Sequence, residues 1–266
     1  MIEKIAVTLI SSIIALVTAL LVARKQAKQQ FQKLVDESTI KRKERLKEIV
    51  DKYSRPILLA ASDLQDRLWH LTQREATSSS ILLEADIDQE KSPRWTMTRK
   101  HYLASTLFLF ARYFAWVEIL RQEVQFLEFG LQDKQNETRQ FFEKLKSVDR
   151  ILSSTEIQND EIETDRQIFQ LQQALIGQLM IKQGQNGVSC INFAEFVENF
   201  DSKFENRDEF IILENLIMQA VSRNVKDFCL SRCCLLNNKL VEMVNLLDPE
   251  GLFVSRSERE LVSIPT

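Results

Sequence analysis

The sequence predicts an all-α protein in which a single N-terminal transmembrane helix is followed by a cytoplasmic helical bundle. Three observations lead to this fold class. Residues 5–23 carry no charge, later segments repeat apolar residues at spacings of three and four, and the 266 residues include only five glycines and four prolines. Helical periodicity with few turn-forming residues favours long helices. A composition of 44% hydrophobic and 27% charged residues is that of a globular protein, not a disordered one.

The first segment, KIAVTLISSIIALVTALLVARK, is long enough to span a bilayer. Its nineteen uncharged residues, 5–23, would extend over roughly 28 Å as a helix. A cleaved leader is one alternative, but the basic region before the apolar run is weak, and Leu20 to Val22 continue the run beyond the small residues at 17–19. A soluble core helix is the other alternative. We predict an uncleaved anchor over residues 1–23.

Basic residues after this segment predict its orientation. Arg24, Lys25 and Lys28 flank it on the C-terminal side, whereas Lys4 stands alone on the N-terminal side. Because such residues remain on the cytoplasmic face, we expect the N-terminus outside and the bulk of the chain in the cytoplasm. The four cysteines are few and unevenly placed, unlike a disulfide framework, which fits that compartment.

Small residues recur every four positions within the predicted span. Ser11, Ala15, Ala19 and Ala23 share one helical face, a pattern typical of close helix–helix packing in lipid. It indicates a seam through which the protein forms a homo-oligomer. An ordinary lipid-facing helix is the alternative.

A basic stalk is predicted over residues 24–53. Residues 24–47 hold nine lysines and arginines and three acids, a net charge of +6, whereas the whole chain has a net charge of −3. We expect the residues next to the span to lie against anionic lipid headgroups. The acidic remainder makes nucleic acid an unsuitable partner. The apolar residues of the stalk do not keep a continuous heptad, so a coiled coil is only an alternative here.

The α-helical domain is predicted over residues 54–251, with a flexible C-terminal tail over 252–266. Pro56 marks an expected helix start. After it, Ile57, Leu64, Leu68 and Leu71 form an apolar stripe. The remaining elements are expected as a loop at 76–97 and helices at 98–129, 137–152, 160–182, 192–204, 207–224 and 226–247.

Residues 102–120 form a second apolar window, which is rich in aromatic residues and contains Arg112 and Glu118. A central arginine costs about 2.5–3.5 kcal/mol on membrane insertion. We therefore predict that this helix is the buried centre of the bundle, with conditional insertion into the membrane as the alternative. Arg112, once buried, requires a carboxylate partner, so we expect a buried ion pair there.

The sequence predicts no catalytic, cofactor-binding or metal-binding residue. The stretch GQNGVSCINFAEF has the closing half of a calcium loop but lacks most of the oxygen ligands, so Asn192 is expected to cap a helix together with Glu195. Cys229, Cys233 and Cys234 have no neighbouring histidine or C-x2-C pair. We expect them to be buried hydrophobes, with metal, redox or acylation roles as alternatives. The common linear motifs of nucleotide binding and hydrolysis are missing.

The predicted function is a protein-interaction or scaffolding module held at the cytoplasmic face of the membrane, with the lipid bilayer and an unknown protein as partners. The first alternative is a membrane-active effector in which residues 102–120 insert conditionally. The second is a membrane-tethered enzyme whose active site leaves no linear motif. The missing motifs make an enzyme the less favoured interpretation.

Overall fold

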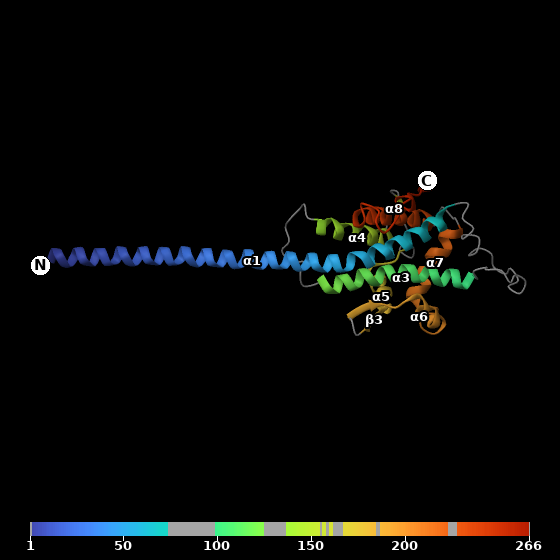
Figure 1. Ribbon diagram of the computed structural model, residues 1–266, viewed down its shortest axis with the longest axis horizontal. Coiled ribbons are helices and arrows are strands. Elements are labelled where there is room, and N and C mark those ends of the chain that lie inside the picture. The colour runs from blue at the N-terminus through green and yellow to red at the C-terminus, as the bar shows by residue number, and fades with distance from the viewer. Residues whose placement is uncertain are drawn as a thin grey trace, which may run out of the picture. The chain divides into compact units, whose positions relative to one another are not determined.

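The computed structural model describes the backbone of residues 2–73, 99–124, 137–154, 156–157, 160–161, 167–184, 187–222 and 228–265. Side chains are described for residues 20–73, 100–124, 138–154, 167–184, 187–222 and 228–265. The chain divides into two compact units, Met1–Glu48 and Ile49–Thr266. The described part of the chain is 81% helical and 4% strand, so the predicted all-α class is confirmed (Figure 1).

Helix α1 (Ile2–Thr72) contains the first unit and continues into the second. The predicted helix start at Pro56 is wrong, because Pro56 lies inside α1. An internal proline removes one backbone hydrogen bond and typically costs about 3 kcal/mol. Here its neighbours Tyr53, Ile57 and Leu58 are buried, and their packing offsets that cost. The predicted stalk–domain boundary at residue 53 is therefore not an element boundary, and the two units meet at residues 48 and 49.

The later part of α1 packs as its periodicity predicts. Ile57, Leu64, Leu68 and Leu71 are each no more than 1% exposed. Arg67 ties this part of α1 to helix α3 (Arg99–Val124) by donating to the carbonyl of Tyr102 and to the hydroxyls of Ser105 and Thr106. Its guanidinium also lies 4.3 Å from the ring centroid of Tyr102.

Helix α3 is the centre of the second unit, as the sequence predicts. It contacts α5, α6, α7 and β4, and it is buried around most of its circumference apart from a partly exposed stripe through Ser105, Leu109, Arg112 and Trp116. Among the described residues it is the one helix that is long and apolar enough to cross a membrane, and 72% of its apolar window is buried inside the protein. A helix that is apolar nearly all round fits a protein core as well as a bilayer. The predicted loop at 76–97 and the predicted helix end near Gly130 lie outside the described residues.

Helices α4 (Glu137–Ser153), α7 (Asp208–Ser222) and α8 (Cys229–Leu247) match predicted helices closely. Both α4 and α7 pack on α8. Arg232 on α8 is 1% exposed, and it donates to the carbonyls of Ile151 and Ser154 at the end of α4. A cation at a helix C-terminus satisfies carbonyls that have no partner within the helix, so Arg232 joins α4 to α8.

The predicted helix over 160–182 is wrong at both ends. The structure has a short hairpin of β1 (Glu156–Ile157) and β2 (Asp160–Glu161), then α5 (Gln170–Leu179), then a hairpin of β3 (Ile181–Gly184) and β4 (Gly187–Cys190). Gly187 has φ of +104°, a conformation that glycine adopts at little cost. Within α5, a Cβ on Gly177 would lie 2.6 Å from the carbonyl oxygen of Phe114, so glycine allows α5 to approach α3.

The predicted helix over 192–204 is divided in two. Helix α6 (Phe193–Glu198) is followed by a π-helical turn, η2 (Phe200–Phe204). The predicted cap is confirmed, since the Asn192 side chain accepts a hydrogen bond of 2.9 Å from the backbone N–H of Glu195. The π turn buries Phe200 and Phe204 against Phe196, which a continued α-helix would space differently.

The C-terminal segment, for which a flexible tail is predicted over 252–266, touches the domain at several points within residues 252–265. Val254 and Val262 are buried. The side chain of Asn238 pairs with both backbone groups of Val262, at 2.9 and 3.0 Å. A short 3-10 turn, η4 (Arg256–Glu258), lies between the two valines. The buried valines and the hydrogen bonds of Asn238 are among the contacts of this segment with the rest of the domain.

Candidate functional site

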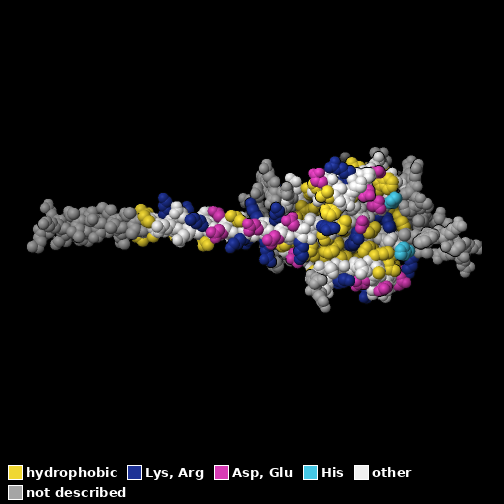
Figure 2. All heavy atoms as spheres, in the orientation of Figure 1, with side chains coloured by type: hydrophobic (Ala, Val, Ile, Leu, Met, Phe, Trp, Pro, Cys, Tyr) yellow, Lys and Arg dark blue, Asp and Glu magenta, His cyan; other side chains and the backbone are white. Residues whose placement is uncertain are grey.

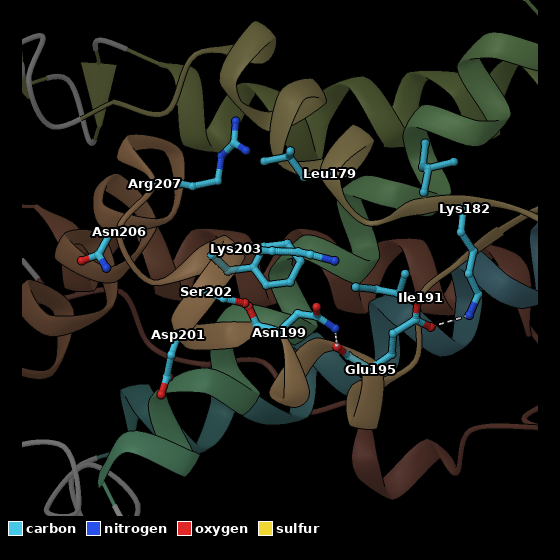
Figure 3. A pocket seen from close by; sticks show the side chains of 12 residues that line it. Leu179, Lys182, Ile191, Glu195, Asn199, Asp201, Ser202, Lys203, Asn206 and Arg207 are labelled. Carbon is cyan, nitrogen blue, oxygen red and sulfur yellow. Dashed lines mark hydrogen bonds and ion pairs between the residues drawn. The ribbon is translucent and has the colours of Figure 1, made fainter.

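A cleft of about 590 Å³ opens in the second unit where five short or terminal segments meet. They are the end of α5, the β3–β4 hairpin, α6, η2 and the turn before α7 (Figure 3). The lining residues are Leu179, Ile181, Lys182, Ile191, Glu195, Asn199, Asp201, Ser202, Lys203, Phe204, Asn206 and Arg207. A volume of this size is in the range of small-molecule pockets.

One wall of the cleft is apolar. Ile181 and Cys190 are paired across the hairpin, and the N–H of Ile191 donates to the carbonyl of Met180 at 2.8 Å. These bonds place Ile181 and Ile191 beside Leu179. Phe204 adds an aromatic ring that stacks on Phe196 with centroids 4.7 Å apart. Behind this wall, Phe196 contacts Phe108 of α3, and Phe204 contacts Phe210 of α7.

The other wall carries charge, most of which is paired. Lys182 pairs with Glu195, Asp201 with Lys100 at 2.7 Å, and Arg207 with Glu209 at 3.3 Å. Lys203 forms no ion pair within the described part of the chain. In Figure 3 its side chain extends across the middle of the cleft, whereas Asp201 and Asn206 point away from it. The cleft thus offers one cation beside an apolar wall, an arrangement suited to binding.

The thiols of Cys190 and Cys233 are not activated. Burial raises the pKa of Cys190 to about 12, against the opposing effect of Arg112, and burial likewise raises the pKa of Cys233. Because the thiolate is the reactive form, neither group is a nucleophile at neutral pH. Cys229, Cys233 and Cys234 are buried in α8, as the sequence predicts. Among the described residues no three His, Cys, Asp or Glu side chains are grouped so as to hold a metal.

Arg112 has the carboxylate partner that its position in α3 requires, but the pair is not buried as expected. Its Nη2 contacts Asp63 of α1 and lies 3.4 Å from the carbonyl of Leu59. The side chains of Arg112 and Asp63 are 23% and 52% exposed. The face of α3 that carries Arg112 is therefore the edge that meets solvent beside α1.

Two buried carboxylates were not singled out by the sequence. Asp149 on α4 pairs with Arg121 of α3, and Asp248 after α8 pairs with Arg259 at 2.9 Å. Burial raises the pKa of Asp149 to about 6, although Arg121 acts in the opposite direction. The hydroxyl of Tyr113 is buried and has no hydrogen-bond partner among the described residues, and burial followed by the Asp149 charge raises its pKa well above the usual value.

The predicted anchor residues are described only in part. Ser11, Ala15 and Ala19 lie outside the described side chains, so the seam stays a prediction. Ala23 is exposed, as are the flanking cations Arg24, Lys25 and Lys28. None of these residues contributes to the cleft.

Comparison with known proteins returned no match to a family model, a curated protein or a solved structure. The functional argument therefore rests on the residues and geometry described above.

Proposed function

We propose that this protein is a membrane-anchored interaction module, in which the start of α1 holds the helical domain at the cytoplasmic face of a membrane. The observation that carries the proposal is the exposure of Leu20, Leu21 and Val22, which are 62%, 62% and 49% exposed. Figure 2 shows hydrophobic side chains where the described side chains of α1 begin, followed by charges of both signs.

Three consecutive helical residues point about 100° apart, so together they extend over about 200° of the helix circumference. A single packed partner covers one stripe, whereas lipid covers every side. Burying each such side chain is worth about 1.5–3 kcal/mol. These three residues end the uncharged run 5–23 and stand just before Arg24, Lys25 and Lys28. An apolar end followed by cations supports an anchor with the domain on the cytoplasmic side.

The cleft is the surface that we assign to binding. Its apolar wall of Leu179, Ile181 and Ile191 can receive an apolar side chain. The amine of Lys203 can pair with a carboxylate on the same partner. A protein segment that carries an acidic residue next to an apolar one has both features.

The anchor is tested by carbonate extraction of membranes that contain the full chain. We expect the wild-type protein to remain in the membrane pellet and a Leu20→Asp, Leu21→Asp, Val22→Asp variant to move to the supernatant, because charge is costly in the hydrocarbon layer. The matched control is Gln26→Asp, Gln29→Asp, Gln30→Asp, which adds the same charge at exposed positions of α1. Retention of the first variant at the wild-type level would contradict the anchor.

The interaction surface is tested by affinity capture from detergent-solubilised membranes with three forms of the full chain. We expect a protein that is recovered with the wild-type chain and with Lys146→Glu to be lost with Lys203→Glu. Lys146 is an exposed lysine of α4 that does not line the cleft, so it controls for charge reversal alone. Equal recovery with all three forms, or no specific recovery, would contradict the assignment of the cleft.

A further inference from the structure

We propose that one face of α8 is a second binding site, which takes an extended segment of another protein in place of this chain's own residues 260–265. We call it the α8 face, and it consists of Leu230, Ser231, Cys234, Asn237 and Asn238. Residues 260–265 lie against it (Figure 1). The site is separate from the cleft, and it depends neither on the cleft nor on the membrane anchor.

The α8 face holds the backbone of this segment. The side chain of Asn238 accepts a hydrogen bond of 2.9 Å from the N–H of Val262 and donates one of 3.0 Å to the carbonyl of the same residue. Asn237 donates to the carbonyl of Glu260 at 3.0 Å. Main-chain hydrogen bonds of this kind give affinity for an extended peptide whatever its sequence. These contacts therefore do not restrict the site to the chain's own segment.

Two of these polar side chains belong to the interior of the domain. Ser231 and Asn237 are 2% and 0% exposed, and Gln65 of α1 is 1% exposed. Gln65 donates to the amide oxygen of Asn237 at 3.3 Å, which fixes the orientation of that amide and leaves its nitrogen to donate to Glu260. Since a buried polar group requires a hydrogen-bond partner, the α8 face is built to have a peptide backbone against it.

Alternate side chains of the segment face α8. They belong to one apolar cluster, whose members are Leu230, Cys234 and Val262, with Trp69 of α1 and Ile264 packed against them. Leu261, by contrast, is 67% exposed, and Ser263 is exposed as well. Because side chains of an extended chain point alternately to opposite sides, the α8 face contacts positions 262 and 264 and leaves 261 and 263 to solvent. It fits an extended segment with a valine-sized residue, any residue, and a second apolar residue.

The chain's own segment is a modest ligand for this site. Among residues 260–265 only Val262 is buried, and Ile264 is half-buried. The hydroxyl of Ser231 lies 3.5 Å from the carbonyl of Pro265, at the limit of a hydrogen bond. Tethering gives the segment an effective concentration on the order of 1 mM.

This balance identifies the occupant. A second copy of the chain carries the same segment, so its binding gains nothing over the tethered one. A segment of another protein whose second apolar side chain becomes fully buried gains apolar contact area and can replace the tethered segment. The occupant that we assign to the α8 face is therefore an extended segment of another protein.

The test uses the full chain in detergent, with Cys234 as a reporter because it packs on Val262. Cys233 is adjacent in α8, lies outside the apolar cluster and is 1% exposed, so it reports on unfolding. Alkylation of each cysteine by iodoacetamide is followed by tandem mass spectrometry. We expect Val262→Asp with Ile264→Asp to raise the alkylation rate of Cys234 about ten-fold and to leave that of Cys233 unchanged, because access limits the reaction of a buried thiol.

The matched control is Leu261→Asp with Ser263→Asp, which adds the same charge at the two outward positions. Both alkylation rates should then stay at the wild-type level, because these side chains do not contact the α8 face. The comparison separates loss of the apolar contacts from the effect of added charge on the segment.

Binding of a free segment is tested with the capped peptide ERELVSIP, the sequence of residues 258–265. Added at about 1 mM to the Val262→Asp, Ile264→Asp chain, it should return the alkylation rate of Cys234 to near the wild-type level. The peptide with Leu261→Gln and Ser263→Lys should protect Cys234 equally, whereas the peptide with Val262→Asp and Ile264→Asp should not. By fluorescence anisotropy, labelled ERELVSIP should bind the wild-type chain about ten-fold more weakly than the variant chain, because the tethered segment competes.

An unchanged alkylation rate of Cys234 in the Val262→Asp, Ile264→Asp chain, or no protection by ERELVSIP, overturns the site. Protection by ERELVSIP alone, and not by the peptide with changed outward positions, overturns its assignment to other proteins. If Cys233 reacts as well, the variant has unfolded, and the anisotropy measurement on the wild-type chain decides, since no binding up to about 1 mM overturns the proposal. A wild-type chain that is dimeric in detergent and becomes monomeric on addition of ERELVSIP also overturns it and assigns the α8 face to exchange between two copies.

Discussion

Asp149 and Asp248 are both buried and both paired with an arginine, yet their pKa values move in opposite directions. Their side chains are 3% and 2% exposed. Burial raises the pKa of Asp149 to about 6. Burial acts on Asp248 in the same direction, but backbone N–H groups and Arg259 outweigh it and hold the pKa of Asp248 below its usual value.

The difference lies in backbone donors. The Asp248 carboxylate accepts from the N–H groups of Leu252, Phe253 and Val254 at 2.8, 3.1 and 3.0 Å, in addition to Arg259. Among the described residues, Arg121 alone donates to the Asp149 carboxylate. One arginine does not replace the hydration that a carboxylate loses on burial, whereas three fixed donors with an arginine do.

The largest expected effect is that of removing the acceptor at Asp248. We expect Asp248→Ala to lower the Tm of the full chain in detergent by roughly 10 °C, because three backbone N–H groups and Arg259 lose their partner. Differential scanning fluorimetry measures this change in Tm. Asp248→Asn keeps one acceptor oxygen, so its Tm should lie between those of the wild type and Asp248→Ala. A Tm for Asp248→Ala within about 2 °C of the wild type would show that the loop does not depend on this carboxylate.

At Asp149, removing the carboxylate charge is predicted to stabilise the fold, the opposite of the effect expected at Asp248. A rise in pKa from 3.8 to about 6 corresponds to about 3 kcal/mol against the ionised form in the folded state at neutral pH. We therefore expect Asp149→Asn to leave the free energy of unfolding at pH 7 unchanged or to raise it by up to that amount. Arg121 is 38% exposed, so water can solvate it in the variant. Denaturant unfolding that shows a clear loss of stability would falsify this account.

The pH dependence follows from the same shift. Between pH 3.8 and about 6 the folded state binds a proton at Asp149 that the unfolded chain does not bind. The stabilising contribution of this proton is complete below pH 3.8 and is lost as the pH rises through 6. Asp149 alone should make the wild type about 1 kcal/mol more stable at pH 5 than at pH 7. The difference between wild type and Asp149→Asn, measured at both pH values, isolates this group. An equal difference at the two pH values would contradict the prediction.

The sequence predicts the apolar centre of the domain better than it predicts these carboxylates. The burial of α3 follows from a window that is apolar nearly all round, and the stripe after Pro56 follows from its spacing. Asp149 lies four residues after Leu145 and three before Leu152, so its place on the buried stripe of α4 was visible. The pairing of Asp149 with Arg121 could not be predicted from the sequence, because it depends on how α3 and α4 pack.

The cleft was missed for a different reason. It depends on the β3–β4 hairpin, which lies largely between the helices predicted over 160–182 and 192–204, and on the η2 turn, which lies within the second of them. The glycines at 184 and 187 indicated a break but not a hairpin that returns the chain against α5. Pro56 shows the converse, since a residue that usually starts a helix is held inside one by the packing of its neighbours.

The smallest expected effect on stability is at a third carboxylate–arginine pair, Asp63 and Arg112, which is exposed where the other two carboxylates are buried. Asp63 and Arg112 are 52% and 23% exposed, so water solvates Asp63 whether or not Arg112 is present. Exposed ion pairs contribute about 0–1 kcal/mol. We expect Asp63→Asn to change the free energy of unfolding by less than about 0.5 kcal/mol, measured by the same denaturant unfolding. A larger loss would mean that pairing with arginine is decisive by itself. A result in the expected range leaves burial and backbone donors as the features that distinguish Asp149 from Asp248.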